Sequence, residues 1–313
     1  MRIIDLHCDT ILKLWEENGA ADLRRNLFSV DVEKLVNAGS LAQFFAIFVD
    51  RQDHTKPYSA FEAMAAVFLN ELAKNTDRLA LARSADELEK NQGAGKISCF
   101  LTIEEGGVLE GSMDNLQAAY QLGVRLITLT WNYPNEIGFP NSEWRYQHNG
   151  LTPFGQDVIC EMNRLGMLID VSHLSDQGFF EVARLSKQPF VASHSNARAI
   201  TGHSRNLTDD MIKTIADQGG VIGLNFCSEF LGASEISRVE DMVRHVLHIM
   251  KVGGRDVLAL GTDFDGINPQ LEIEHIGQIG SLIRALEQAG LTETELEKFC
   301  WQNSLRLIRD VMG

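Results

Sequence analysis

The feature that most limits the fold of this chain is a regular alternation of apolar runs with helical patterns. Strands rich in β-branched residues are predicted at 3–9, 41–49, 97–104, 124–131, 168–172, 190–194, 219–226 and 257–263. Helices are predicted at 10–17, 58–76, 113–122, 153–166, 176–187, 209–218, 238–252, 276–289 and 293–312. Strands that are joined by helices run parallel, and eight such units are the number that closes a TIM barrel.

We therefore expect an α/β protein, a (β/α)8 TIM barrel with an extra C-terminal helix. An open, doubly wound sheet is the main alternative, but no GxGxxG turn follows the first strand. No linker or change of composition divides the chain, so a single domain over residues 1–313 is predicted. Helix starts are expected at Thr152-Pro153, Ser175, Thr208 and the capping box Thr292–Glu295.

The net charge of the chain disfavours two classes of binding partner. A net charge of −15 with a pI near 5.0 disfavours binding to nucleic acid or to an anionic membrane. Neither a signal-peptide pattern nor an apolar run of about 18 residues is visible, so we expect no membrane span. The five cysteines are scattered without a CxxC spacing, which is typical of reduced thiols and predicts a cytoplasmic protein.

Titratable side chains gather where the predicted strands end. They are His7, Asp9, Glu104, Glu105, His173, His194, Asp263 and Asp265. In a TIM barrel the carboxyl ends of all strands meet on one rim, which is where active sites lie. Three histidines and several carboxylates on one rim indicate a metal centre. The alternative is a set of polar side chains that only satisfy one another by hydrogen bonds.

The number of candidate ligands indicates two metals rather than one. His7, Asp9, His173 and His194 plus one carboxylate exceed the three protein ligands of a catalytic zinc, and paired metals commonly share a bridging carboxylate. Glu105 is the preferred bridge because two glycines follow it, and Glu104 is then expected to point away. Zinc is the default ion, with manganese or cobalt as alternatives.

Two further residues are candidates for hydrolytic chemistry. Asp263 can hydrogen-bond a water beside the metals and move its proton. Arg205, in the loop after the sixth strand, can clamp a substrate carboxylate. The alternatives are a surface arginine or an ion pair with Asp209 or Asp210. His245 and His248 lie three apart on a predicted helix, where a zinc-binding pair would be four apart, so a structural place on a helix face is favoured.

These residues also carry a resemblance to a known family. The motifs Asp5-Leu-His-Cys-Asp-Thr10, Glu105-Gly-Gly107, Val171-Ser-His-Leu-Ser175, Ser193-His-Ser195, Arg205-Asn206 and Gly261-Thr-Asp-Phe-Asp-Gly266 occur in the order seen in the membrane (renal-type) dipeptidases. That family consists of metallopeptidases of the amidohydrolase-like TIM-barrel group, which cleave dipeptides at a centre of two zinc ions.

The resemblance implies a role for each matching residue. His7 and Asp9 would bind one zinc, His173 and His194 the second, and Glu105 would bridge them, while Asp263 would be the acid/base and Arg205 would hold the C-terminal carboxylate of the dipeptide. Two positions that should face the substrate depart from the animal enzymes. Trp131 replaces a histidine and Cys227 a tyrosine, so a lost carbonyl contact would come from Asn132 or from a zinc.

The resulting hypothesis is a binuclear zinc dipeptidase that attacks the peptide bond with a metal-bridging hydroxide and accepts C-terminal D-residues. Two alternative functions are a related amidohydrolase that acts on a lactam, a cyclic amide or an N-acyl amino acid, and a non-catalytic metal-binding barrel. Members of the family often form dimers, so the resemblance is also compatible with a homodimer.

Overall fold

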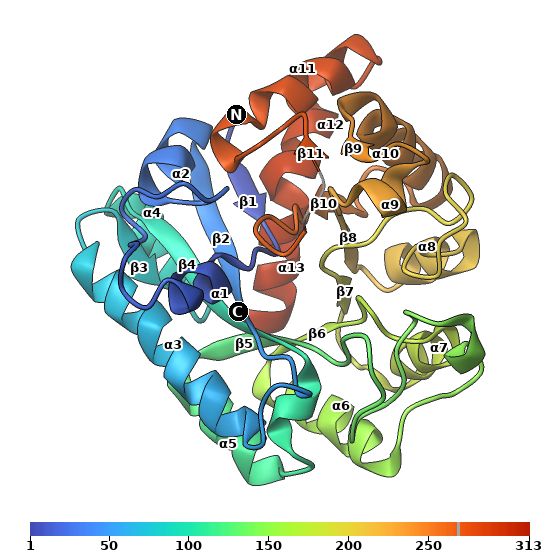
Figure 1. The fold of residues 1–313 in the computed structure, drawn as a ribbon. Coiled ribbons are helices and arrows are strands. Elements are labelled where there is room, and N and C mark those ends of the chain that lie inside the picture. Colours follow the sequence, from blue (N-terminus) through green and yellow to red (C-terminus); the bar gives the residue numbers. More distant parts are fainter. Residues whose placement is uncertain (268–269) are drawn as a thin grey trace.

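The computed structural model describes residues 1–267 and 270–313 and contains the predicted barrel (Figure 1). The parallel strands of the barrel are β1 Ile3–Asp5, β2 Ser40–Phe48, β4 Ile97–Glu104, β5 Val124–Thr128, β6 Leu168–Asp170, β7 Val191–Ala192, β8 Val221–Leu224 and β10 Leu258–Leu260. They pair in the order β2-β1-β10-β8-β7-β6-β5-β4, and pairing of β2 with β4 closes the ring. The prediction of a (β/α)8 barrel is therefore confirmed.

Helices surround the strands on all sides in Figure 1. They are α1 Thr10–Glu16, α2 Val32–Ala38, α3 Pro57–Lys74, α4 Ala85–Gly93, α5 Met113–Leu122, α6 Pro153–Leu165, α7 Asp176–Leu185, α8 Asp209–Asp217, α9 Ser228–Leu231, α10 Val239–Gly253, α11 Gly280–Gln288, α12 Glu293–Glu297 and α13 Asn303–Met312. The expected N-caps at Thr152, Ser175 and Thr208 and the capping box at Thr292 are confirmed, each with a side chain that accepts a backbone N–H.

The barrel encloses a small apolar cluster of its own. Phe44 and Phe100 stack inside it with ring centroids 4.5 Å apart. Residues from α13, including Leu307 and Ile308, belong to the same cluster, so the predicted C-terminal helix closes one end of the barrel. The other face of each strand packs against the surrounding helices in a larger cluster, which includes Leu101 of β4.

Several elements differ from the sequence-based expectation. The first strand ends at Asp5 rather than residue 9, so His7 and Asp9 lie on the turn that follows it. An excursion between α3 and β4 was not predicted, and it contains β3 Leu79–Leu81, which pairs with the first half of β4, and α4. The short sheet of β9 Ile236–Ser237 and β11 Gln270–Leu271 was also missed. These strands of two or three residues are too short to give a readable period. Within the described residues, no helix combines the length and apolarity that a membrane crossing requires.

Candidate metal centre

Three carboxylates converge on one imidazole nitrogen at the rim of the barrel. The Nε2 atom of His7 lies 3.3 Å from Oδ2 of Asp9, 3.2 Å from Oε2 of Glu104 and 3.8 Å from Oδ1 of Asp263. The four residues are at most 8% exposed. Their parent segments, the turns after β1 and β10 and the end of β4, are neighbours or nearly so in the ring, which explains why residues so distant in sequence meet.

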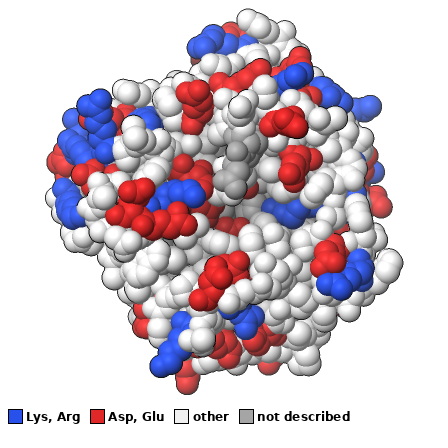
Figure 2. Space-filling view, viewed as in Figure 1, with Lys and Arg blue, Asp and Glu red and all other residues white. Residues whose placement is uncertain are grey.

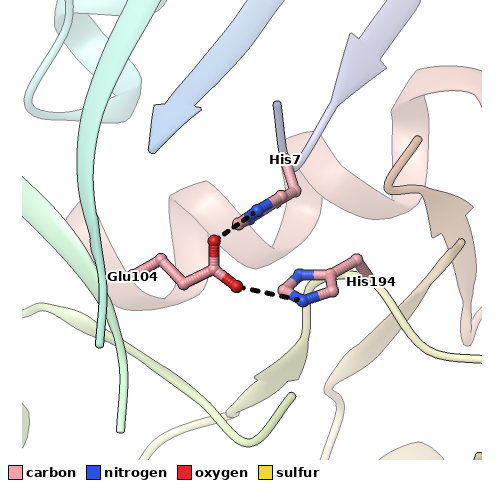
Figure 3. Close-up of side chains that lie close together, drawn as sticks. All are labelled: His7, Glu104 and His194. Carbon is pink, nitrogen blue, oxygen red and sulfur yellow. Dashed lines mark hydrogen bonds and ion pairs between the residues drawn. The ribbon is translucent and has the colours of Figure 1, made fainter. Parts of the chain in front are cut away.

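The second oxygen of Glu104 faces the other two predicted histidines. Oε1 of Glu104 lies 3.1 Å from Nε2 of His173 and 3.7 Å from Nε2 of His194. Figure 3 shows the Glu104 carboxylate between the rings of His7 and His194, with one oxygen directed at each. The Glu104 carboxylate thus connects His7 and Asp9 on one side to His173 and His194 on the other. We call these five residues and Asp263 the metal cluster.

The choice of Glu105 as this connecting carboxylate is wrong. Its Oε1 accepts hydrogen bonds from Gly107 N at 2.7 Å and from Asn135 Nδ2 at 2.6 Å, and its Oε2 accepts one from Trp131 N at 3.0 Å. Both carboxylate oxygens of Glu105 are therefore held by hydrogen bonds from the loops next to β4 and β5. The alternation of β4 contains the correct signal, because Glu104 shares a strand face with Phe100 of the inner cluster, whereas Glu105 follows the strand.

A buried relay orients His194, and the sequence analysis did not find it. Asp170 at the end of β6 accepts the hydroxyl of Ser193 on Oδ2 at 2.5 Å and the backbone N–H of Ser193 on Oδ1 at 2.9 Å. Because the Ser193 hydroxyl donates to Asp170, its oxygen accepts from Nδ1 of His194, 2.8 Å away. This fixes the tautomer of His194 and leaves its Nε2 unprotonated toward Glu104.

A second contact orients His173. Its Nδ1 atom lies 3.2 Å from Oδ1 of Asn132, which accepts the Nδ1 proton and directs Nε2 toward Glu104. Asn132, which the sequence analysis considered as a donor to the substrate carbonyl, therefore uses its side-chain oxygen to hold a candidate ligand. Two histidines in the cluster thus have their distal nitrogens fixed by side chains outside it.

The protonation states suit metal binding. Burial lowers the pKa of His173 to about 4, with a further contribution from Arg205, and burial together with His7 holds the pKa of His194 well below its usual value. Both rings are neutral at pH 7 and offer a lone pair. Burial opposes a charge on His7, but Glu104 and Asp9 outweigh it, so the pKa of His7 is raised well above its usual value in the absence of a metal.

Unpaired buried atoms indicate that the cluster fits cations. Nε2 of His194 and Oδ1 of Asp9 are buried and have no hydrogen-bond partner among residues 1–267 and 270–313. Side-chain nitrogen and oxygen atoms of His7, Glu104 and His194 lie within 4.8 Å of one another, and so do those of His7, Asp9 and Asp263. Buried carboxylates and bare imidazole nitrogens at this spacing are the donor set of a divalent transition metal, which also offsets their charge.

Backbone strain gathers at the same rim. The φ values of His173, Asp263 and Glu105 are 68°, 60° and 72°. These values lie in the left-handed region of backbone conformation, which residues other than glycine rarely adopt. Such strain persists where the surrounding structure demands it, and it commonly marks functional sites. Close packing supports the arrangement, because a Cβ atom on Gly223 or Gly261 would collide with the carbonyl oxygen of Ser193, next to His194.

The cluster opens into a cavity of 710 Å³. Its lining includes Asp9, Glu104, His173 and Asp263 from the cluster and, from the residues discussed above, Trp131, Asn132 and Cys227. Figure 2, in the same view as Figure 1, shows a surface that is hollowed near its middle, with acidic and basic side chains around the hollow. A cavity of this size fits a small substrate.

Arg205 lies beside the cluster as a buried arginine with spare donors. It is 2% exposed, its Nη2 is 3.5 Å from the carbonyl oxygen of His194, and its guanidinium lies 5.1 Å from the ring centroid of Phe230. Its Nε and Nη1 atoms have no partner in the described part of the chain. The alternative of a surface arginine paired with Asp209 or Asp210 is wrong, because Arg205 is buried and contacts neither of them.

Comparison with known proteins places the chain in a family. Residues 1–312 match the family described as membrane dipeptidase, peptidase family M19. The chain belongs to the membrane dipeptidase family. It is 30% identical to the uncharacterized dipeptidase C965.12 of Schizosaccharomyces pombe over 98% of this chain and 79% of that protein. M19 membership makes the protein a metallopeptidase-type hydrolase by descent, which agrees with the donor set of the cluster.

Two solved metallopeptidase structures resemble this family member over nearly its whole length. Dipeptidase AC, a metallopeptidase of family M19, is 28% identical, covers 100% of this chain and 99% of its own, and has a TM-score of 0.92. A metallopeptidase from Rhodobacter sphaeroides, solved with a phosphinate mimic of the dipeptide L-Ala-D-Ala, is 27% identical over 99% of both chains with a TM-score of 0.91.

Proposed function

We propose that this M19 metallopeptidase is a dipeptidase that hydrolyses the single peptide bond of free dipeptides with two metal ions, zinc by default. The observation that carries the proposal is the position of Glu104, whose two oxygens face His7 on one side and His173 and His194 on the other. A carboxylate in this position suits a bridge between two cations. This replaces Glu105 in the ligand set that the sequence suggested.

The residues divide into two ligand groups. His7, Asp9 and Glu104 would hold one ion, and Glu104, His173 and His194 would hold the other. When bound, paired metals supply a water-derived nucleophile at neutral pH and polarise the carbonyl that is attacked. The Asp170–Ser193 relay and Asn132 keep Nε2 of His194 and of His173 free for this purpose.

Asp263 is placed to move protons at its Oδ1 atom. Asn225 donates to its Oδ2 at 2.8 Å, which leaves Oδ1 directed toward the cluster, 3.8 Å from Nε2 of His7. Without bound cations, burial raises the pKa of Asp263 to about 6, against the attraction of His7. A carboxylate that keeps one oxygen free beside the metal ligands can take a proton from the attacking water and return it to the departing amine.

Arg205 would bind the C-terminal carboxylate of the substrate. Its unpaired Nε and Nη1 donors are buried beside the cluster, and a carboxylate is the group that matches a guanidinium fork. An anchor this close to the reaction centre favours a substrate with one peptide bond. The dipeptide mimic bound by the Rhodobacter sphaeroides relative supports the same substrate class, including a C-terminal D-residue.

The test is hydrolysis by metal-loaded and by chelated protein of L,L- and L,D-dipeptides, of N-acyl amino acids and of a lactam. Dipeptide cleavage that disappears on chelation and returns with zinc is the expected result. Cleavage of only the N-acyl compounds or the lactam would favour the related amidohydrolase, and bound metal without any turnover would favour a non-catalytic barrel.

Two adjacent glutamates provide a matched pair for the metal. Glu104→Gln should lose bound metal and activity together, because it removes the shared carboxylate. Glu105→Gln should retain the metal, because the hydrogen bonds of Glu105 are to Gly107, Asn135 and the main chain of Trp131, none of which is a proposed metal ligand. Metal content by elemental analysis distinguishes the two, and equal loss in both variants would contradict the ligand assignment.

A further inference from the structure

The cavity has an aromatic side that the proposed chemistry does not use. Phe48, the last residue of β2, and Trp131, which follows β5, both line it. Their rings meet edge to face with centroids 4.7 Å apart, and Tyr133 packs against Trp131 in the same way at 5.4 Å. Leu12 also lines the cavity. We call Phe48 and Trp131 the aromatic wall.

The strand that carries Phe48 lies across the barrel from the strand before the Arg205 loop, and the strand before Trp131 lies two places from each of them. In the closed strand order β2-β1-β10-β8-β7-β6-β5-β4, strand β2 is four places from β7 by either route. Arg205 follows β7 and stacks on Phe230, which follows β8. Strand β4 lies between β2 and β5, and from its end the Glu104 carboxylate reaches toward His173 and His194, which follow β6 and β7.

This layout gives a dipeptide a direction. If Arg205 holds the C-terminal carboxylate and the peptide bond lies over Glu104, the N-terminal residue extends toward β2 and β5 and meets the aromatic wall. Resting on the proposed function, we infer that the aromatic wall is the subsite for the N-terminal side chain and that it selects dipeptides with an apolar or aromatic N-terminal residue. Aromatic edges and faces gain contact area from such a side chain, whereas a charged one would lose its hydration there.

Glu105 fixes the wall in place. Its carboxylate, 1% exposed, accepts the backbone N–H of Trp131 and the side-chain amide of Asn135. The next residue after Trp131 is Asn132, which orients His173. Glu105 is therefore a positioning residue, which sets the main chain of the wall without touching the substrate. A glutamine here would direct N–H groups at one of its three donors, so the substitution should displace Trp131.

The experiment measures selectivity rather than activity. With zinc-loaded protein, kcat/KM is determined for X–Ala dipeptides in which X is Phe, Leu, Ala, Asp or Lys. We expect Phe–Ala and Leu–Ala to exceed Ala–Ala by about tenfold or more, which is the usual gain from extra carbon atoms in an apolar pocket. Trp131→Ala and Phe48→Ala should each reduce the Phe–Ala to Ala–Ala ratio several-fold, and Glu105→Gln should reduce it while metal content is retained. Trp144→Ala, which removes an exposed indole away from the cavity, is the matched control and should keep the wild-type ratio.

The outcomes separate the two proposals. Dipeptide hydrolysis with equal rates for all X, or a ratio unchanged in both wall variants, would overturn the subsite and leave the proposed function standing. A preference for Asp–Ala would make Lys13, which also lines the cavity, the determinant and would equally overturn it. Wild-type protein that carries metal but cleaves none of the dipeptides would overturn the proposed function and the subsite together. Melting temperatures show whether a variant is folded, and either wall variant alone is sufficient for the test.

Discussion

At the base of the barrel, α13 packs Leu307 and Ile308 against apolar side chains of the strands, whereas at the rim the same strands end in histidines and carboxylates. The base is a close-packed core in which burial stabilises the fold. The rim collects like charges, bare imidazole nitrogens and left-handed backbone, all of which cost stability. One end of this barrel therefore stabilises the chain, while the other end holds the reactive groups.

The largest expected effect is a loss of turnover, without a loss of stability, when Asp263 at the rim is replaced. Asp263→Asn keeps the hydrogen-bonding shape but removes the proton acceptor. Dipeptide kcat should fall by a factor on the order of 10²–10⁴, while metal content and melting temperature stay near the wild-type values. Steady-state kinetics and elemental analysis check this. Undiminished turnover would show that Asp263 has no part in the proton transfer.

A substitution at the base should instead lower the stability of the fold and leave catalysis nearly unchanged. Leu307→Ala leaves a cavity in the inner cluster and should lower the free energy of unfolding by about 2–5 kcal/mol. The kcat and KM of the remaining folded protein should be nearly unchanged, because Leu307 is at the far end of the barrel. Denaturant unfolding measures the loss. A change in kcat/KM comparable with that of the rim variant would break the division between the two ends.

A smaller effect is expected at Arg205 and on substrate binding. Arg205→Ala should raise KM for dipeptides by about 10–100-fold, the worth of one or two hydrogen bonds to a charged group. Esters of the same dipeptides, which lack the carboxylate, should be nearly unaffected. Arg205→Lys keeps the charge without the fork and should be intermediate. Equal losses on acids and esters would argue against the carboxylate clamp.

The smallest effect concerns pH and the loop behind Arg205. His245 of α10 accepts the backbone N–H of Ala197 on Nδ1 and contacts the carbonyl oxygen of Leu231 with Nε2, so it joins the Arg205 loop to the end of α9. Burial lowers the pKa of His245 to about 4. A histidine in the unfolded chain has a pKa near 6.5 and binds its proton first, so stability should be lost as the pH falls from about 6.5 to 4.

The size of this loss is on the order of 1–2 kcal/mol after allowance for relaxation. Unfolding free energies at pH 7 and pH 5 give it as the difference between wild-type protein and His245→Gln, a side chain that does not titrate. Leu307→Ala removes no titratable group, so it should keep the wild-type pH dependence. Parallel pH profiles for wild-type protein and His245→Gln would refute the role of His245.

How far the sequence predicted the site differs from residue to residue. His173 and His194 follow short apolar strands, and their meeting followed from the barrel geometry alone. The choice between Glu104 and Glu105 depended on where β4 ends, and a left-handed residue directly after the strand turns the second carboxylate away. His245 was correctly placed on a helix, but its contacts come from two loops that no periodicity describes.

Asp170 shows the same limit. Asp170 is the last residue of β6. Nothing in the sequence around it indicates that it would accept the Ser193 hydroxyl and thereby fix the tautomer of His194. Such relays depend on the register between neighbouring strands, which is set by the packing of the whole ring.

The amino-acid pattern is sufficient to specify the barrel, since alternating strand and helix periods allow few other ways to bury their apolar faces. It also determined that histidines and carboxylates collect on one rim, because parallel strands all end there. The folded arrangement was needed to show which oxygen faces which nitrogen, which glutamate enters the cluster and which aromatic rings border the cavity. Those choices depend on backbone dihedral angles and strand register, and a difference of one residue or one φ angle reverses the direction of a side chain.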